Sequence, residues 1–242
     1  MRARWTRSAG GSPHERGPAR GAGWPVTAPT GIGMTSDRTR GRMVDVLRKS
    51  GIRDERVLAA MLEIPRHLFV EAGIASRAYE DTPLPIGHGQ TISSPTIVAL
   101  MTQLLLEKGP VAKVLEVGTG CGYQTAILAK LVKEVYTLER IAPLMDKARR
   151  HLRDLRFYNV RFKHADGHKG YPEGGPYDGI LCAATASHVP AALKDQLAVG
   201  GRLVIPVGTD DQWLHVIERT PAGFTDDKRD AVRFVPLLPG IA

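Results

Sequence analysis

The sequence of 242 residues predicts an α/β fold: a doubly wound, mostly parallel seven-stranded sheet with a helical N-terminal annex and an antiparallel C-terminal edge hairpin. Three observations predict it. Beyond Gly109, short apolar segments alternate with segments of helical periodicity, a pattern typical of parallel strands joined by right-handed helical crossovers. Before Gly109, apolar residues recur at helical spacing. Near the C-terminus, two extended segments have no long helix between them, as in an antiparallel hairpin.

The annex is expected to begin with two helices. The first starts near Arg42 and closes at Gly51, since glycine is a common residue just after a helix C-terminus. Asp54 can cap the second helix, which stops at Pro65. Short helical segments are then expected at 67–72 and 76–80, followed by an irregular, turn-rich segment at 82–95.

A third helix is expected from Pro95 to about Leu106, because Ser94 suits the N-cap and proline suits the first helical position. The sheet follows. We expect strands at 112–117, 133–138, 159–164, 177–182 and 201–207, with helices at 122–131, 142–156 and 189–197. The edge hairpin is expected to pair Trp213–Arg219 with Ala231–Leu237.

Residues 1–33 differ in composition from the rest of the chain. They hold five arginines, one acidic residue, seven glycines and four prolines, without apolar periodicity. We expect a disordered basic extension here; a basic interaction arm and upstream sequence translated from a misplaced start are the alternatives. Met34, or in second place Met43, is the expected physiological start.

Residues 34–242 are expected to form one domain, with the helical annex and an active-site loop at 34–109 and a cofactor-binding sheet at 110–242. No apolar run approaches the ~20 residues that cross a bilayer. Two cysteines, Cys121 and Cys182, are too few for a disulfide framework, so we expect a cytoplasmic protein. The eight histidines lack metal-binding spacing, and no metal is expected.

The first expected strand of the sheet ends in a glycine-rich turn. Gly118, Gly120 and Gly122 recur at every second position, Glu116 stands just ahead of them, and the next strand ends in Glu139. Glycines at such a turn allow close approach of a ligand, and an acid ending the next strand can accept both ribose hydroxyls. A dinucleotide fingerprint has its third glycine one position later. This spacing resembles the first motif of S-adenosyl-L-methionine-dependent methyltransferases, and the Glu116 carboxylate would suit the cofactor's cationic groups.

Asp166 and Gly167 follow the third expected strand of the sheet. Ligands of open α/β sheets bind at the carboxyl ends of the strands, where an aspartate could accept a hydrogen bond from an adenine amino group. The alternative is that Asp166 only opens a turn.

Another candidate site precedes the third helix. Gln90, Thr91 and Ser93 gather just before its N-terminus, where unpaired N–H groups and a partial positive charge favour a carboxylate ligand. Ser94 alone would satisfy the capping role, so the other polar side chains are left for a ligand.

Several segments together resemble the protein-L-isoaspartate O-methyltransferase family. The resemblance extends over nearly everything from about Met43 to the C-terminus. Its motifs lie at Pro65–Phe69, Leu84–Gly87, Gly87–Pro95, Val114–Ala126 and Ala231–Leu237. The element Thr91–Ser93 is specific to the family, whereas the glycine turn is shared by methyltransferases at large. Departures occur at His88, at Cys121 and in the turn at 183–188.

The resemblance implies a Rossmann-like methyltransferase that transfers a methyl group from S-adenosyl-L-methionine to the free carboxylate of L-isoaspartyl residues in damaged proteins. Ser93 is then the active-site serine, and Val232 and Arg233 help to hold the substrate backbone together with Ser93. The implied cofactor-binding residues are Gln90, Thr91, Ile92, Glu116, Gly118, Gly120, Gly122, Glu139, Asp166 and Gly167.

This chemistry requires no catalytic base, because a carboxylate with a pKa near 4 is already ionised at neutral pH. Ser93 is therefore interpreted as a hydrogen-bonding group that positions the substrate. Two alternatives remain: a nucleic-acid methyltransferase that uses the net charge of +8, and a non-catalytic protein that binds S-adenosyl-L-methionine. Half of that charge lies in residues 1–33, so a nucleic-acid partner is not expected. The resemblance implies damaged proteins and peptides that contain L-isoaspartate as partners. No membrane partner is expected, and we expect a monomer.

Overall fold

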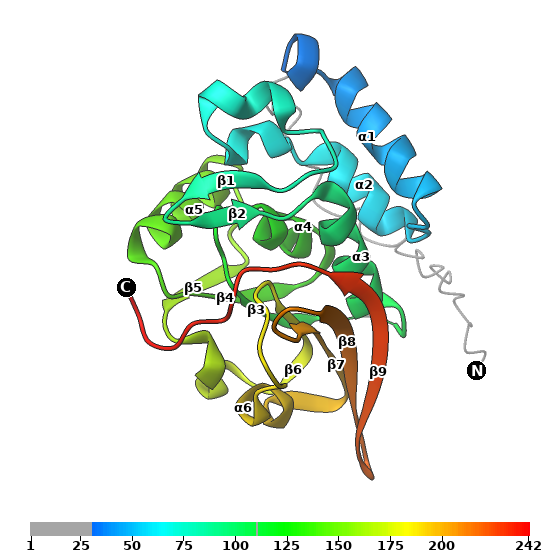
Figure 1. Cartoon of the computed structure of the whole chain (residues 1–242), viewed down its shortest axis with the longest axis vertical. Coiled ribbons are helices and arrows are strands. Elements are labelled where there is room, and N and C mark those ends of the chain that lie inside the picture. The colour runs from blue at the N-terminus through cyan, green and yellow to red at the C-terminus, as the bar shows by residue number, and fades with distance from the viewer. Residues whose placement is uncertain (1–30, 110) are drawn as a thin grey trace, which may run out of the picture.

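The computed structural model describes residues 31–109 and 111–242. It contains a seven-stranded sheet in the order β5-β4-β3-β6-β7-β8-β9, with an annex of helices packed over one face (Figure 1). The five strands from β5 to β7 run parallel, and β8 and β9 are antiparallel. The expected fold class is confirmed. The expectations for residues 1–30 lie outside the described residues.

The elements follow the order that the sequence predicts. The annex contains α1 (Asp37–Lys49), α2 (Glu55–Glu63), β1 (Leu84–Gly87), β2 (Gln90–Ile92) and α3 (Pro95–Leu106). The sheet region contains β3 (Lys113–Val117), α4 (Tyr123–Leu131), β4 (Glu134–Glu139), α5 (Ala142–Asp154), β5 (Val160–His164), β6 (Tyr177–Cys182), α6 (Ala191–Asp195), β7 (Leu197–Val207), β8 (Gln212–Thr220) and β9 (Gly223–Val232). Short 3₁₀ turns lie at Gly33–Thr35, Arg66–Phe69, Ala72–Arg77, Gly167–Lys169 and Pro172–Gly174.

Capping residues set the helix ends in the annex. The Asp54 carboxylate accepts the Arg56 amide hydrogen at the start of α2, and Gly51 takes a φ of 98° just after α1. The first helix begins at Asp37, earlier than expected, because the Ser36 side chain caps it by accepting from the Thr39 amide. Helix α3 has the predicted bounds.

Two hydrophobic clusters hold the layers together. The larger one joins the annex, α3, α4 and α5 to one face of the sheet and includes Leu47, Met61 and Leu128. The smaller one packs α6 and nearby turns against the opposite face and includes Leu193 and Ile205. Because both faces are covered, the central parallel strands are almost wholly buried, as expected for this sheet type.

The segment at 82–95 differs from the expected irregular loop. It forms the two-stranded hairpin β1–β2, in which Leu84 pairs with Ile92. The strands are three and four residues long, too short for a periodic pattern to be visible. Their inward side chains are buried against the main core, so tertiary packing decides this structure.

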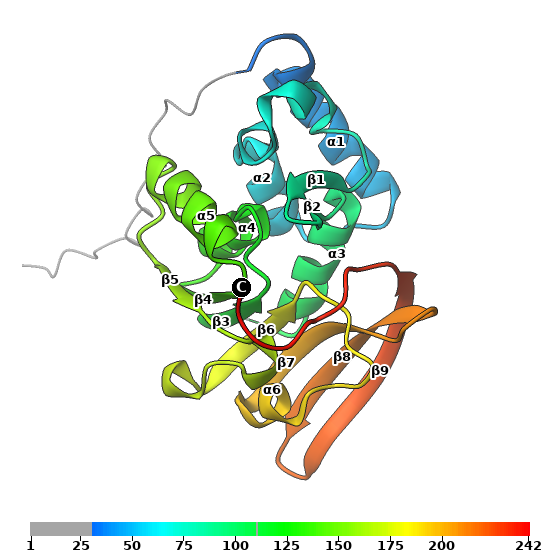
Figure 2. The same cartoon turned by 60° about the vertical axis from the view of Figure 1, so that its left-hand side comes forward.

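The C-terminal hairpin also differs from expectation. Its second strand is β9 at Gly223–Val232, whereas the sequence predicted 231–237. This strand lies at the exposed edge of the sheet and is rich in charged residues, so it lacks the apolar alternation of a half-buried strand. Residues 233–237 instead cross between the strand ends and the annex (Figures 1 and 2), where the Leu237 amide donates to the Thr185 carbonyl.

Candidate active site

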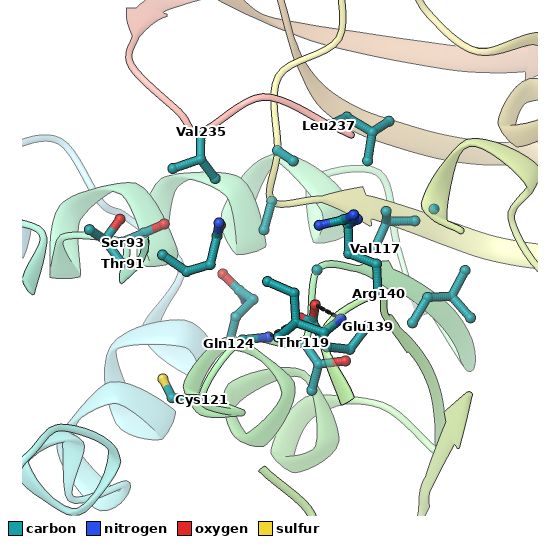
Figure 3. Close-up of a pocket in the computed structure, with 18 of the residues that line it drawn as sticks. Thr91, Ser93, Val117, Thr119, Cys121, Gln124, Glu139, Arg140, Val235 and Leu237 are labelled. Carbon is teal, nitrogen blue, oxygen red and sulfur yellow. Dashed lines mark hydrogen bonds between the residues drawn. The ribbon is translucent and has the colours of Figure 1, made fainter. Parts of the chain in front are cut away.

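A cavity opens at the carboxyl ends of β3, β4 and β6, beneath the hairpin β1–β2. Together with the open solvent at its mouth, it holds about 950 Å³ of free space. Four groups of residues line most of it: Gln90–Ser93 with Val98 and Met101, the turn Val117–Cys121, the segment Leu138–Ile141, and Val235–Leu238. Figure 3 shows Thr91 and Ser93 at one end, Thr119 and Glu139 at the other, and Val235 and Leu237 above them.

The glycine turn brings the backbone close to this cavity. Gly118 and Gly120 both line it, with φ angles of 95° and 55° that favour glycine. A Cβ atom on Gly118 would lie 3.4 Å from the Ala183 Cβ, and one on Gly120 would lie 3.3 Å from the Ile86 Cδ1. The turn therefore leaves space for a ligand. Side chains at these two positions would reduce that space.

The carboxylate of Glu139 holds this turn in place. Its two oxygens accept the backbone amide hydrogens of Gly120, at 2.8 Å, and of Ile141, at 2.9 Å. Each oxygen has two lone pairs, so each keeps one acceptor site beyond these bonds. Two remaining acceptors on one carboxylate suit the adjacent hydroxyls of a ribose.

Ser93 lies at the opposite end, beside the N-terminus of α3. The neighbouring Ser94 caps the helix by accepting from the Ile97 amide, so Ser93 is not needed for this role. Among the described residues, the Ser93 hydroxyl makes no hydrogen bond and lines the cavity. It is available to a ligand that also meets the positive end of the helix dipole.

Comparisons with known proteins decide the family. The sequence model of the family "Protein-L-isoaspartate(D-aspartate) O-methyltransferase (PCMT)" matches residues 38–241. The chain belongs to this family.

Relatives and solved structures agree with this assignment. The chain is 60% identical to the protein-L-isoaspartate O-methyltransferase of Dechloromonas aromatica, over 87% of this chain and 98% of the relative. It is 59% identical to that of Methylobacillus flagellatus, over 87% and 96% of the two chains. It also resembles a putative protein-L-isoaspartate O-methyltransferase from Plasmodium falciparum, solved in complex with S-adenosyl-L-homocysteine, at 29% identity and a TM-score of 0.73, over 82% and 98% of the chains. The resemblance inferred from the sequence is confirmed.

The structure corrects the expected position of one acid of the family's glycine motif. Glu116 is fully buried and does not line the cavity. One carboxyl oxygen accepts hydrogen bonds from the hydroxyls of Thr125, at 2.5 Å, and Thr137, at 2.6 Å. Burial raises the pKa of Glu116 to about 8, although these two hydrogen bonds lower it. Glu116 shares a strand face with Val114, so its side chain points under α4, where Thr125 donates to it.

Gly122 and Asp166 also lie outside the cavity lining. A Cβ on Gly122 would come within 2.6 Å of the Leu152 Cδ2, so this glycine allows the turn to pack against α5. The Asp166 carboxylate accepts the amide hydrogens of His168 and Gly240, and thereby ties a 3₁₀ turn to the C-terminal segment. Its contacts match the alternative in which it opens a turn, whereas Gly167 lines the cavity.

The two residues expected to hold the substrate backbone do not line the cavity either. Val232 ends β9 and packs against the main core, and Arg233 is exposed. The residues that follow them, Val235–Leu238, line the cavity instead. The sequence pattern did not indicate them, because it predicted a strand that continues through 237. The family motif at 231–237 is the signal that could have indicated these residues.

Cavity residues from other segments were also missed, among them Thr119, Gln124 and Arg140. Thr119 lies within the glycine turn, Gln124 in the first turn of α4 and Arg140 just after β4, and these positions could have indicated them. Cys121 lines the cavity as a free, buried thiol whose pKa burial raises to about 11, so it stays protonated at neutral pH.

Within residues 31–109 and 111–242, no cluster of three or more histidine, cysteine or acidic side chains could hold a metal ion. No helix in these ranges has the length and apolar composition of a membrane span.

Proposed function

We propose that the cavity beneath the hairpin β1–β2 binds S-adenosyl-L-methionine and an L-isoaspartyl side chain end to end. As a member of its family, the protein is an S-adenosyl-L-methionine-dependent carboxyl methyltransferase that repairs isoaspartyl residues in damaged proteins. The observation that carries the proposal is the placement of Glu139 and the glycine turn at one end of a single cavity and Ser93 at the other (Figure 3).

The described residues fit the cofactor. Gly118 and Gly120 keep the cavity open where side chains would reduce it, and Glu139 offers two free acceptor sites for ribose hydroxyls. Gly167 and Leu237 form an apolar part of the lining that suits an adenine ring. A Cβ on Gly167 would lie 2.4 Å from the Val117 Cγ1, so this position requires glycine. The bound cofactor supplies an electrophilic methyl group on its sulfonium.

The substrate end needs positioning more than proton transfer. The acceptor carboxylate has a pKa near 4 and is ionised at neutral pH, so no side chain has to remove a proton. The Ser93 hydroxyl can donate a hydrogen bond to that carboxylate and hold one oxygen toward the methyl group. Positioning of reactants in this way can lower the activation free energy by roughly 7–11 kcal/mol.

Closure of the site depends on two segments. The hairpin β1–β2 contributes Gln90, Thr91 and Ile92, and the C-terminal segment contributes Val235 and Leu237. Both cover the strand ends and exclude water from the place where the carboxylate and the methyl group meet. We further propose that the protein acts in the cytoplasm as a monomer, with Val232 and Arg233 near the path of the substrate chain.

The test is transfer of a radiolabelled methyl group to a pair of peptides that differ only in one aspartyl linkage. We expect methylation of the L-isoaspartyl peptide and none of the normal aspartyl peptide. Folded RNA and duplex DNA serve as competing acceptors in physiological salt. Methyl transfer to either nucleic acid, or cofactor binding without transfer to the isoaspartyl peptide, would contradict the proposal.

A further inference from the structure

A chain of hydroxyl groups links the buried Glu116 to the wall of the cavity. Thr137 Oγ1 lies 2.6 Å from the carboxyl oxygen of Glu116 and also 2.6 Å from Thr119 Oγ1. Thr119 is 3% exposed and lines the cavity, where Figure 3 shows it beside Glu139. The second carboxyl oxygen of Glu116 has no hydrogen-bond partner among the described residues. A buried carboxyl group with one unpaired oxygen is therefore connected to the cofactor site by hydrogen bonds through two hydroxyl groups.

The direction of this chain depends on the proton of Glu116. When the carboxyl group is ionised, it only accepts, so Thr137 donates to Glu116 and Thr119 can donate to Thr137. The Thr119 oxygen then presents lone pairs to its surroundings. When the carboxyl group is protonated, it can donate to Thr137, Thr137 to Thr119, and the Thr119 hydrogen is left for another acceptor. Ionised Glu116 thus makes this part of the wall more negative.

The reaction changes the charge of the ligand in the proposed cofactor site. The cofactor is a sulfonium cation, and methyl transfer converts it into the neutral thioether S-adenosyl-L-homocysteine. The positive charge of the sulfonium and the negative charge of the substrate carboxylate cancel in the thioether and the methyl ester. A buried carboxylate is stabilised by a nearby cation and loses that stabilisation when the cation is consumed.

We propose that Glu116 is a specificity-determining residue: its carboxyl group releases a proton to solvent when the cationic cofactor binds and recovers one when the neutral product occupies the site. The inference rests on the proposed cofactor site. Its consequence is a preference for the methylated cofactor over the product that depends on Glu116 and acts through Thr137 and Thr119.

The surroundings of Glu116 make such a proton exchange possible at neutral pH. Strand β4 presents Thr137 and Glu139, helix α4 presents Thr125, and β6 places Leu181 in register beside Glu116. Of these, Glu139 is titratable, and its negative charge opposes ionisation of Glu116. Burial is the larger effect and raises the pKa of Glu116 to about 8, so the carboxyl group of the free enzyme is mostly protonated at pH 7.

The experiment is isothermal titration calorimetry of the whole protein with each ligand, in buffers of different ionisation enthalpy near pH 7. We expect binding of S-adenosyl-L-methionine to release up to roughly one proton more than binding of S-adenosyl-L-homocysteine. Because both ligands carry the same amino and carboxyl groups, Glu116→Gln identifies the source of the difference. The substitution keeps the side-chain size and removes the titration, so it should abolish the difference. Thr119→Val should reduce it.

The matched control is Glu134→Gln, the same substitution at an ion pair with Arg161 at the amino end of β4. This variant should retain the wild-type difference in proton release between binding of S-adenosyl-L-methionine and binding of S-adenosyl-L-homocysteine. In the wild type, the ratio of the product Kd to the cofactor Kd should rise on the order of tenfold between about pH 6.5 and pH 8, and stay flat in Glu116→Gln.

Two results would overturn the inference: equal proton release for both ligands in the wild-type protein, or a proton difference that persists in Glu116→Gln. The first result is measured on the native chain, so the test does not depend on the stability of a variant. Failure of the proposed function is distinguishable, because it is read from methyl transfer to the isoaspartyl peptide, whereas this test needs only binding. Absence of binding by either ligand would overturn both.

Discussion

The Glu139 carboxylate accepts the backbone amide hydrogen of Gly120 at 2.8 Å, so the end of β4 holds the turn that leaves β3. The last residue pair between these strands joins Val117 to Leu138, and Glu139 extends one position beyond it. Its side chain therefore reaches the glycine turn instead of a neighbouring strand. This relationship places a carboxylate with free lone pairs at the edge of the cavity.

Replacing Glu139 should weaken cofactor binding. Glu139→Gln keeps the shape but removes a charged acceptor, and hydrogen bonds to charged groups contribute about 1.5–3 kcal/mol. We expect the Kd for S-adenosyl-L-methionine to rise roughly ten- to a hundredfold. Equilibrium dialysis with radiolabelled cofactor measures it, and Glu134→Gln on the same strand is the control. An unchanged Kd would remove the ribose-binding role proposed for Glu139.

Substitutions of the neighbouring Ser93 and Ser94 should have different effects, the first on turnover and the second on stability. Ser93→Ala is expected to lower kcat by about a hundredfold, as removal of a single positioning donor does elsewhere, with little change in cofactor Kd or Tm. Ser94→Ala removes the cap of α3 and should lower the free energy of unfolding by about 1 kcal/mol while most turnover survives. Peptide methylation and urea denaturation distinguish them. Near-normal kcat in Ser93→Ala would contradict the assigned role.

Gly122→Ala should destabilise the protein. The residue has a φ of 90°, and its new Cβ would lie 2.6 Å from the Leu152 Cδ2 and 3.1 Å from the Ala148 Cβ. We expect a loss of about 1–3 kcal/mol in the free energy of unfolding. Gly41→Ala is the matched control, because this helical glycine has an ordinary φ and open space around it. It should stabilise α1 by up to about 1 kcal/mol. Equal effects of the two substitutions would exclude this packing argument.

The burial of His67 and His151 should lower the free energy of unfolding in mild acid. Burial lowers the pKa values of His67 and His151 below the ordinary value of about 6.5. The unfolded chain then binds more protons than the folded one below that pH, so the free energy of unfolding falls as the pH drops from about 6.5. His151→Asn retains a donor to the Cys121 carbonyl, to which His151 Nδ1 is hydrogen-bonded at 2.9 Å. It should make the fall shallower in urea denaturation between about pH 6.5 and pH 5. A slope equal to that of the wild type would contradict this assignment.

Much of the fold could be predicted because its signals are local. The cap at Ser94, the proline after it and the glycine at position 51 act within one helical turn, and the structure keeps these helix ends. The alternation of strands and helices likewise follows from short apolar segments. The hairpin β1–β2 was missed, because three or four residues carry no periodicity. The edge hairpin was predicted, but its second strand was placed too late in the chain, because an exposed edge strand needs no apolar side.

The candidate site was predictable in part. Gln90–Ser93, Gly118, Gly120 and Glu139 meet around one cavity, as their positions at strand ends and a helix start indicated. The position of Glu116 could not be read in this way. An acid two residues before a glycine can point to either face of the sheet, and the burial of Val114 on the same face turns it under α4.

The sequence by itself determined the class of sheet, the helix ends at Gly51, Asp54 and Ser94, the glycine turn, and the serine beside a helix N-terminus. Each of these features depends on residues a few positions apart. Only the tertiary structure decided which acid faces the cavity and which segment covers it. Glu139 reaches the site because β4 extends past β3, and Val235–Leu238 close it because backbone hydrogen bonds join them to Thr185, far away in the chain. Strand register and pairing between distant segments are properties of the whole fold, and no local pattern encodes them.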